Sequence, residues 1–419
     1  MRQVSRRELI KGLAGLGLCA LGGGALVSEL SCAMRDEALR QAQDEVSQAE
    51  SASPVSSPHV REAMYYMGVE GGLDCRACHG SAEPSRVLYC HTSHASDHVK
   101  CQLCPRECVI SEGRRGECRV RENRGGKLYT MVYGNPCAVH VDPIEKKPFN
   151  HFLPTTLAFS IATAGCNLHC LYCQNWQISQ RPPEETDNVD LLPEKVVEWA
   201  LKTGSHSIAY TYAEPVVFYE YMLATARLAR PAGVGNVVIT NGYLNPAPLR
   251  ELCRAVDAFR IDFKGYNEEF YEEVCSGTLS PVLEAMKTVY EEGVHLELPV
   301  LVAPTLNDDE DEIRGMCRWI SENLGPDVPV HFNRFTPLYK LKNLPPTPVE
   351  TLERAREIGT EEGINYIYIG NVPGHPANNT YCAHCGKLII SRMGFYVTEY
   401  HLVGGKCEYC GNPIPGVWE

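Results

Sequence analysis

The chain has 419 residues, of which 44% are hydrophobic and 22% charged, with 35 glycines and 28 prolines. This composition is that of a globular protein with a sizeable core, and it argues against collagen, coiled coils, multi-span membrane proteins and wholesale disorder. Lysine and arginine number 39 against 52 aspartate and glutamate, so the net charge of −13 argues against a general binder of nucleic acid or anionic membranes. The compositional outlier is the 20 cysteines, which must either pair as disulfides or bind metal.

The N-terminus reads as a targeting segment over residues 1–33. The sequence Ser-Arg-Arg-Glu-Leu at residues 5–9 is similar to a twin-arginine export signal, and residues 12–27 follow without a charge. This uncharged run is shorter than the roughly 20 residues that span a bilayer comfortably, and an uncleaved weak anchor is the alternative. The twin-arginine route carries proteins already folded around cofactors, so the signal hints at a metal centre. Residues 34–60 are polar and predict a linker with some helix.

Most of the cysteines fall into groups with short, regular spacings. Such spacings put several thiolates within reach of one metal centre, whereas a disulfide framework needs no such repetition. The sequence therefore predicts metal binding in four groups: Cys75, Cys78 and Cys90; Cys101, Cys104, Cys108 and Cys118; Cys166, Cys170 and Cys173; and Cys382, Cys385, Cys407 and Cys410.

The last group has the spacing CxxC–x21–CxxC, and a glycine follows each CxxC. Glycine tolerates the left-handed turn that lets backbone amides approach the thiolates. Between the two pairs, residues 388–390 and 395–400 predict a small hairpin. Four thiolates with no open position indicate a zinc-ribbon-like module over residues 376–419, with rubredoxin-like iron as the alternative.

The first two groups predict a Cys/His-rich, metal-binding module over residues 61–150. The set that begins at Cys101 suits either structural zinc or a second, auxiliary iron–sulfur cluster, and its spacing does not separate the two. The segment Cys75-Arg-Ala-Cys78-His79 fits the attachment pattern of c-type haem. The local crowd of further thiol and imidazole groups favours a non-haem zinc or iron site instead, with Cys90, His91, His94 and His98 as its members.

The CxxxCxxC triplet is the sharpest signal in the chain. A cubane cluster has four irons, so three cysteine ligands leave one iron open for a small molecule to chelate. This open iron distinguishes a cluster that takes part in a reaction from one that only transfers electrons. The alternative is a cluster completed by a fourth residue such as His169 or Cys137.

The region around the triplet alternates between strand and helix patterns. Short apolar, β-branched runs occur at residues 157–163, 207–212, 236–240, 258–262, 295–302, 330–332 and 366–369. Amphipathic segments separate them, with helical faces formed by Val282, Leu283, Met286, Val289 and Tyr290, and by Ile313, Met316, Cys317 and Ile320. Such alternation predicts parallel strands in a partial (β/α)6-type TIM barrel over residues 151–375, with Cys253 and Cys317 as core thiols.

In such barrels the active site lies at the carboxyl ends of the strands. The chemically suggestive segments all follow predicted strands, which brings them to one end of the barrel: the Cys166 loop, Glu214, Asn241, Asp262 with Lys264, Pro304, and Asn333 with Arg334. Each of these residues also has a purely structural alternative. These are a solvated loop glutamate at 214, an ordinary turn at 241, a buried ion pair between 262 and 264, and a hydrogen-bonded core histidine at 331.

The triplet, with an aromatic residue just before its last cysteine, resembles the radical S-adenosylmethionine (radical SAM) superfamily. Four longer stretches, at residues 101–108, 119–129, 136–148 and 173–176, are similar to the radical enzyme of the AmmeMemoRadiSam system, a relative of pyruvate formate-lyase activating enzymes. The resemblance covers roughly residues 98–419. The Cys/His-rich stretch at residues 68–98 departs from the family pattern.

The resemblance implies that Cys166, Cys170 and Cys173 hold a [4Fe-4S] cluster whose open iron binds S-adenosylmethionine. It further implies that the backbone of Tyr172 lies against adenine and that Glu214 matches the segment that contacts the methionine ammonium. Asn241 is then a candidate contact to ribose or carboxylate, and Asp262 and Lys264 are candidates for cofactor or substrate binding.

The sequence therefore predicts a radical SAM enzyme that cleaves S-adenosylmethionine reductively and abstracts hydrogen from an unidentified substrate. An exported electron-transfer protein with iron–sulfur and haem centres is the alternative, and a zinc-only scaffold is a third. The resemblance permits a protein substrate, and it implies an electron donor of the flavodoxin or ferredoxin type and association with Memo-type and AMMECR-type proteins. No nucleic-acid partner is expected. Membrane contact is expected only through the N-terminal segment, if that segment is not cleaved. The localisation is left open by two conflicting indications. The N-terminal signal indicates export, whereas S-adenosylmethionine and low-potential electrons are supplied in the cytoplasm.

Overall fold

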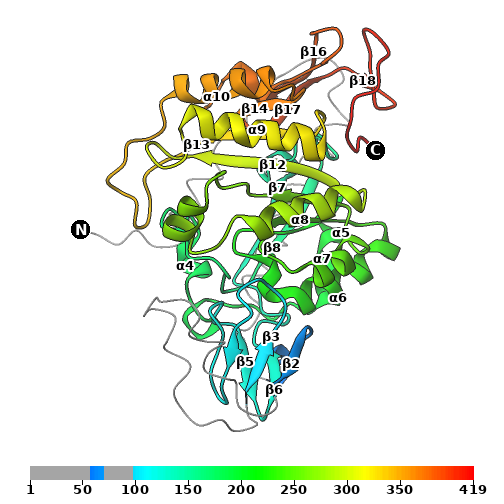
Figure 1. Ribbon diagram of the computed structural model, residues 1–419. Helices are drawn as coiled ribbons and strands as arrows, with labels where there is room; N and C mark the ends of the chain where they lie inside the picture. The colour runs from blue at the N-terminus through cyan, green and yellow to red at the C-terminus, as the bar shows by residue number, and fades with distance from the viewer. Residues whose placement is uncertain (1–56, 70–97) are drawn as a thin grey trace, which may run out of the picture.

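The computed structural model describes residues 57–69 and 98–419. The predicted signal, almost all of the linker, and the candidate ligands Cys75, Cys78 and Cys90 lie outside the described residues. Along the long axis of the molecule, a small N-terminal module, a central α/β barrel and a C-terminal ribbon follow one another (Figure 1). Among the helices of the described residues, none is long and apolar enough to cross a bilayer.

The centre of the molecule is a mixed sheet of eight strands in the order β14-β13-β12-β11-β10-β9-β8-β7. Its parallel strands are β8 (Leu157–Ala162), β9 (Ser207–Tyr210), β10 (Gly235–Thr240), β11 (Ala258–Ile261), β12 (His295–Val302), β13 (Val330–Arg334) and β14 (Ile367–Gly370). The seven predicted strands are thus confirmed, as is the partial barrel. The apolar, β-branched runs form these strands because both faces of the sheet are covered.

The sequence missed the first strand of this sheet, β7 (Ala138–Pro143), which pairs antiparallel with β8. Most side chains of β7 are half-buried or exposed, and the strand includes His140 and Asp142, so it has no apolar run to reveal it. The predicted boundary at residue 150 therefore falls between two hydrogen-bonded strands.

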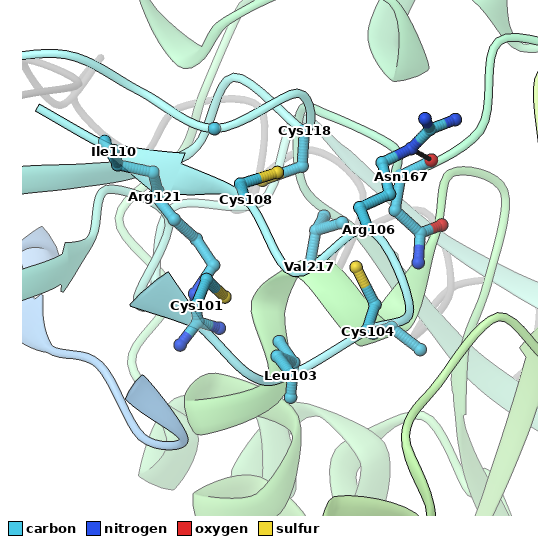
Figure 2. Close-up of a pocket in the computed structure, with 12 residues that line it drawn as sticks. Cys101, Leu103, Cys104, Arg106, Cys108, Ile110, Cys118, Arg121, Asn167 and Val217 are labelled. Atoms are coloured by element: carbon cyan, nitrogen blue, oxygen red, sulfur yellow. Dashed lines mark hydrogen bonds between the residues drawn. The ribbon is translucent and has the colours of Figure 1, made fainter. Parts of the chain in front are cut away.

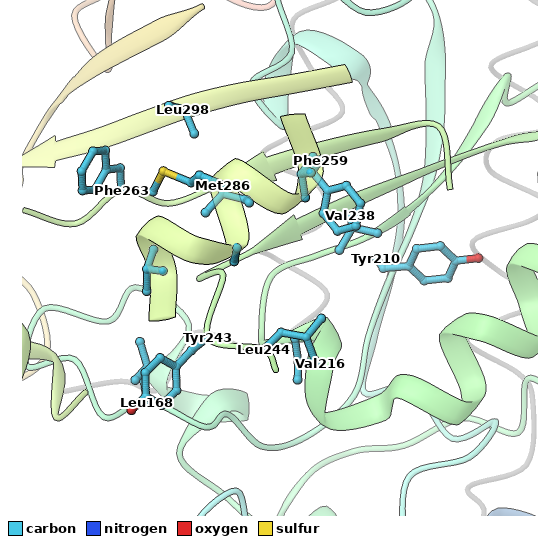
Figure 3. Close-up of a cluster of buried hydrophobic side chains, with 14 of the residues drawn as sticks. Leu168, Tyr210, Val216, Val238, Tyr243, Leu244, Phe259, Phe263, Met286 and Leu298 are labelled. Atoms are coloured by element: carbon cyan, nitrogen blue, oxygen red, sulfur yellow. The ribbon is translucent and has the colours of Figure 1, made fainter. Parts of the chain in front are cut away.

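Helices cover the outer face of the sheet and close its core. They are α5 (Pro193–Lys202), α6 (Tyr219–Ala229), α7 (Pro246–Cys253), α8 (Ser280–Glu291), α9 (Glu310–Leu324) and α10 (Val349–Glu361). The short α4 (Trp176–Ser179) instead follows the cysteine loop at the carboxyl ends of the strands. Met286 of α8 is buried in the same hydrophobic cluster as Phe259 and Val238 of the sheet (Figure 3). Cys253 and Cys317 are buried in this core, as predicted, whereas Tyr290 at the end of α8 is exposed.

The N-terminal module consists of two small antiparallel sheets, β1-β6-β5 and β2-β3-β4. Their bounds are Arg61–Glu62, Lys127–Thr130 and Arg121–Arg124 for the first, and Tyr66–Gly68, Val99–Cys101 and Val109–Ile110 for the second. Arg121 of β5 is buried, and its guanidinium lies 2.8 Å from the carboxylate of Glu220 in α6. This buried ion pair fixes the module against the barrel.

The C-terminal ribbon contains the predicted hairpin, formed by β16 (Leu388–Met393) and β17 (Tyr396–Tyr400), with β15 (Thr380–Tyr381) on the other side of β16. A second, two-stranded sheet joins β18 (Leu402–Val403) to β19 (Lys406–Cys407). Arg392 of β16 is buried and donates a 2.8 Å hydrogen bond to the carbonyl of Asn150, in the connection between β7 and β8. The ribbon is therefore held on the barrel and not only tethered to it.

Candidate functional site

A cavity of about 810 Å³ opens at the carboxyl ends of the parallel strands. The eight side chains predicted to bind the cluster or S-adenosylmethionine all line it: Cys166, Cys170, Tyr172, Cys173, Glu214, Asn241, Asp262 and Lys264. They come from the loops after four successive strands, β8 to β11, which the parallel sheet brings to one end. Of the other strand-end residues, Asn333 lines the cavity. Arg334 instead donates its Nε hydrogen bond to the carbonyl of Thr347 at 2.8 Å.

The loop that carries the three cysteines turns sharply after β8. Gly165 has φ +94°, and a Cβ at this position would lie 2.6 Å from the carbonyl oxygen of Cys118. Only glycine accommodates both this backbone conformation and this approach. Contact with the N-terminal module thus explains why a glycine directly precedes Cys166, the first cysteine of the triplet.

The three thiols are oriented by hydrogen bonds from their surroundings. The backbone amide of Leu168 lies 3.4 Å from the sulfur of Cys166, and the hydroxyl of Ser179 lies 3.2 Å from that of Cys173. Burial raises the pKa of the Cys166 thiol well above its usual value, which opposes a free thiolate there. Bound iron stabilises thiolates, so this set of buried sulfurs at a cavity wall suits a cluster and not a reactive free cysteine.

Neither of the two residues considered as a fourth ligand is among the described residues that line the cavity. His169 points its Nδ1 at the side chain of Gln180, 2.8 Å away, and its Nε2 at Glu117, 3.4 Å away. The backbone amide of Cys137 donates to Ala162 in the sheet.

The sequence patterns did not single out Cys275, a buried thiol that hydrogen-bonds to Cys170 and lies 3.5 Å from the hydroxyl of Tyr172. It ends a π-helical turn, Phe270–Cys275. The carbonyl of Cys275 accepts a hydrogen bond from the amide of His169, so the turn supports the cysteine loop from behind. A single cysteine outside any spacing pattern gives no signal in the sequence.

Glu214 is buried between the ends of β9 and β10. Its carboxylate accepts hydrogen bonds from the Thr240 hydroxyl at 2.6 Å, the Asn241 amide at 2.9 Å and the Val216 amide at 3.0 Å. Burial raises the pKa of Glu214 to about 7, although these donors oppose the rise. A carboxylate has about four acceptor positions, so one remains for a ligand. The alternative of a solvated loop glutamate is wrong.

Asp262 and Lys264 form the ion pair considered above, with 3.2 Å between the Lys264 Nζ and a carboxylate oxygen. Arg260 lies 2.9 Å from the other oxygen of the same carboxylate. The ammonium of Lys264 also lies 6.0 Å from the ring centre of Tyr172. Two cations thus face one carboxylate at the cavity wall, which leaves excess positive charge beside the cysteine loop.

The far wall of the cavity comes from the last two strands and the ribbon. His331 is a hydrogen-bonded core histidine, which was its structural alternative in the sequence analysis. Its Nε2 lies 2.7 Å from the buried carboxylate of Glu297. A Cβ at residue 370 would overlap the side-chain oxygen of Asn333, so Gly370 gives this asparagine its place in the wall. Asn378 and Phe395 of the C-terminal module complete the rim.

The four C-terminal cysteines converge on one point. The sulfurs of Cys382 and Cys410 are 3.7 Å apart, and those of Cys385 and Cys407 are 3.8 Å apart. A tetrahedral zinc with Zn–S bonds of about 2.3 Å separates its sulfurs by about 3.8 Å. The residues present therefore fit a zinc ion, as the spacing predicts.

The four N-terminal cysteines surround a separate small cavity, together with Arg106, Arg121 and Asn167 (Figure 2). Burial raises the pKa of the Cys108 thiol to about 12 and also raises that of Cys118. Within the described part of the chain, the C-terminal set is the only group of three or more potential ligands that converges to within 4.8 Å. The N-terminal sulfurs are therefore brought together around a space, but not onto one point.

A family model described as the radical SAM superfamily matches residues 160–317. The uncharacterized protein MJ0808 of Methanocaldococcus jannaschii is 48% identical over 318 residues, which cover 75% of this chain and 95% of that protein. The pyruvate formate-lyase 1-activating enzyme of Escherichia coli is 22% identical over 219 residues, 49% of this chain and 89% of that enzyme. A solved radical SAM methyltransferase from Sphaerobacter thermophilus has 17% sequence identity and a TM-score of 0.43, covering 57% of this chain and 71% of that one.

Proposed function

Since the chain belongs to the radical SAM superfamily and is an enzyme, we propose that its barrel cavity binds S-adenosylmethionine at a three-cysteine [4Fe-4S] cluster and acts on a separate substrate there. One observation carries this proposal: the loop with Cys166, Cys170 and Cys173 and the candidate cofactor residues of three further strand ends line the same cavity. When bound, the cluster and S-adenosylmethionine supply a 5′-deoxyadenosyl radical that abstracts hydrogen.

The residues of this chain orient the cofactor and keep water away. Glu214 has one acceptor position left for the amino group of the methionine moiety, and a carboxylate facing a cation is a favourable pairing. Its hydrogen bond to the Asn241 amide places the Asn241 side chain beside Cys166, where the amide nitrogen lies 3.9 Å from the sulfur. Lys264 holds positive charge near Tyr172, on the side where an adenine is expected.

The substrate is proposed to enter from the side of the C-terminal module. The cofactor residues occupy the walls built by β8 to β11, while Tyr368, Asn378 and Phe395 line the opposite side. The hairpin next to this rim exposes the large apolar side chains of Met393 and Tyr396, each 69% accessible. An apolar rim outside a deep cavity suits a polypeptide segment better than a free metabolite.

The finer assignment is to the AmmeMemoRadiSam system, with Memo-type and AMMECR-type proteins as partners. The motifs at residues 101–108, 119–129, 136–148 and 173–176 support it. The similarity to an activating enzyme supports an electron donor of the flavodoxin or ferredoxin type. We also propose zinc at the C-terminal four-cysteine site, on the sulfur distances given above.

The N-terminal segment supports export, while the cofactor supply supports the cytoplasm. Cell fractionation with N-terminal sequencing of the mature protein distinguishes the two. A processed N-terminus outside the cytoplasm supports export, and an intact Met1 in the cytosol discards it.

The central test is reductive cleavage of S-adenosylmethionine by anaerobically prepared, cluster-loaded protein. We expect 5′-deoxyadenosine and a change in the electron paramagnetic resonance (EPR) spectrum of the reduced cluster when S-adenosylmethionine is added. The Cys173→Ala variant should lose both, and the core variant Cys253→Ala should keep them because its thiol lies away from the cavity. If the wild-type protein gives neither product nor spectral change, the electron-transfer alternative replaces this proposal.

A further inference from the structure

We propose that Cys101, Cys104, Cys108 and Cys118 bind a second [4Fe-4S] cluster, not zinc, and that this cluster passes electrons to the cluster held by the Cys166 loop. The four cysteines come from the start and end of a loop that folds back on itself: the amide of Cys101 donates to the carbonyl of Cys108 at 2.9 Å. The relay rests on the function proposed above, whereas the identity of the metal does not.

The two four-cysteine sites of this chain differ in how closely their sulfurs approach one another. The C-terminal sulfurs approach to 3.7 and 3.8 Å, which is the edge of a zinc tetrahedron. The N-terminal sulfurs do not converge in this way within the described residues, and they line a cavity of about 20 Å³ instead. In a cubane cluster each thiolate binds its own iron at a corner, so the sulfurs stand apart around a body of iron and sulfide.

A buried guanidinium lies beside the N-terminal cysteines. Arg121 lines the same cavity, is 2% exposed, and its Nε has no hydrogen-bond partner among the described residues. Figure 2 shows its guanidinium beside Cys101. Glu220 compensates the charge of this guanidinium but leaves its Nε–H without an acceptor, and metal-bound thiolates beside it are better acceptors than neutral thiols. The occupied form of the site therefore carries thiolates bound to metal.

The N-terminal cysteine site and the barrel cavity lie on either side of one backbone segment. Asn167 lines the N-terminal cavity, while its chain neighbours Cys166 and Leu168 line the barrel cavity. Consecutive Cα atoms are about 3.8 Å apart, so one backbone segment separates the two cavities. The guanidinium of Arg106 donates to the carbonyls of Asn167 and Ser276, and the Asn245 amide donates to the carbonyl of Leu103 at 3.1 Å. These contacts fix the N-terminal cysteine loop directly behind the cysteine loop of the barrel.

This position defines an electron path. Gln102 and Glu107, on the same loop, are exposed, so a donor can approach the loop that carries the N-terminal site. A one-electron donor of the flavodoxin or ferredoxin type is oxidised by one electron, and the N-terminal cluster is reduced from the 2+ to the 1+ state. It returns to 2+ when it passes that electron to the barrel cluster, and no bond or proton is exchanged.

The metal is tested in a Cys166→Ala/Cys170→Ala/Cys173→Ala variant, which leaves the N-terminal site intact. Prepared anaerobically with iron and sulfide, it should contain about four iron atoms and about one zinc per chain. After reduction it should give a [4Fe-4S] EPR signal that S-adenosylmethionine does not change. A preparation with about two zinc atoms and no iron, or with one zinc and no iron, would overturn the assignment.

The relay is tested first in the wild-type protein, which avoids any folding defect. With both clusters reduced, magnetic coupling should broaden or split the EPR spectrum relative to the sum of the spectra of two variants. These are the triple variant above and Cys104→Ser/Cys108→Ser. A spectrum equal to that sum would contradict the close placement.

The second relay measurement uses the rate at which reduced flavodoxin reduces the barrel cluster. In the Cys104→Ser/Cys108→Ser variant this rate should fall by an order of magnitude or more, while dithionite still reduces the barrel cluster and S-adenosylmethionine still perturbs it. An unchanged rate with flavodoxin would overturn the relay. The two proposals fail separately, because wild-type protein can form 5′-deoxyadenosine with zinc at the N-terminal site, and the triple variant can hold iron whether or not that product is formed.

Discussion

The two four-cysteine sites differ in what holds them. The C-terminal site lies in a short ribbon of which only a small core, around Ile389 and Ile390, is buried. The N-terminal site lies against the barrel, and its cysteines belong to the same large core as the sheet and helices. A metal would therefore contribute more to the order of the first site, whereas the second is already organised by packing around a space that a metal centre can fill.

The largest effect is expected from loss of the C-terminal metal. Structural zinc sites contribute about 10 kcal/mol or more of binding free energy, which the ribbon cannot replace with its own core. We expect a Cys385→Ser/Cys410→Ser variant to lose about one zinc per chain and to become sensitive to proteolysis beyond residue 380. Zinc content and limited proteolysis measure this. An ordered, protease-resistant ribbon without metal would contradict the comparison.

The next effect concerns the buried ion pair that joins the N-terminal module to the barrel. Removing Arg121 leaves the Glu220 carboxylate buried and unpaired, so Arg121→Ala should cost about 3–5 kcal/mol in the free energy of unfolding. The matched control is Arg115→Ala, whose partners Glu122 and Glu184 are nearer to the surface and whose loss should cost about 1 kcal/mol or less. Denaturant unfolding of both variants measures the difference. Equal losses would show that the N-terminal module does not depend on this contact.

A smaller effect tests the close contact between the N-terminal site and the cysteine loop. At Gly165 a Cβ would meet the carbonyl oxygen of Cys118 at 2.6 Å, in a backbone with φ +94°. We expect Gly165→Ala to cost about 2–3 kcal/mol in the free energy of unfolding and to weaken the coupling between the two clusters. The control Gly113→Ala has φ +69° but no atom within 4 Å of its Cβ, so only the backbone strain, about 1 kcal/mol, remains. A Gly165→Ala variant no less stable than the control would exclude the close approach.

The smallest effect is a pH dependence in the barrel site, which neither cysteine module should share. Because the pKa of Glu214 is raised to about 7, its carboxyl is mostly protonated at pH 6 and mostly ionised at pH 8. The cationic amino group of S-adenosylmethionine favours the ionised form, so affinity should rise several-fold from pH 6 to about pH 7.5 and fall again at higher pH, where an amino group with a pKa of about 8 loses its own proton. Equilibrium binding to the cluster-loaded protein measures the rise. Glu214→Gln should abolish the step, and a step that persists in this variant would exclude Glu214 as its source.

Much of the barrel was predictable because its strands are buried on both faces and therefore read as continuous apolar runs. The prediction failed at β7, an edge strand whose polar side chains carry no such run. It also placed Tyr290 on a buried helical face, although the residue lies at the end of α8 where the helix leaves the core. Periodicity records which residues repeat, but not where an element passes beyond its neighbours.

The candidate site was predictable wherever the ligands are close in the chain or follow a strand. The triplet and the strand-end residues Glu214, Asn241 and Asp262 meet in one cavity because parallel strands share an end. Cys275 was missed because it contacts Cys170 only through folding. The contribution of Asn378 and Phe395 to the cavity rim was equally invisible, since it depends on how the ribbon docks.

The sequence by itself determined which cysteines are grouped by their spacing and which strands carry the candidate residues of the barrel site, because both follow from short-range spacing and from burial. Only the tertiary structure decided how far apart the sulfurs of each group stand and which group lies behind the Cys166 loop. Those distances depend on segments remote in the chain, such as Cys118 against Gly165 and Arg121 against Glu220, whose packing no local pattern encodes.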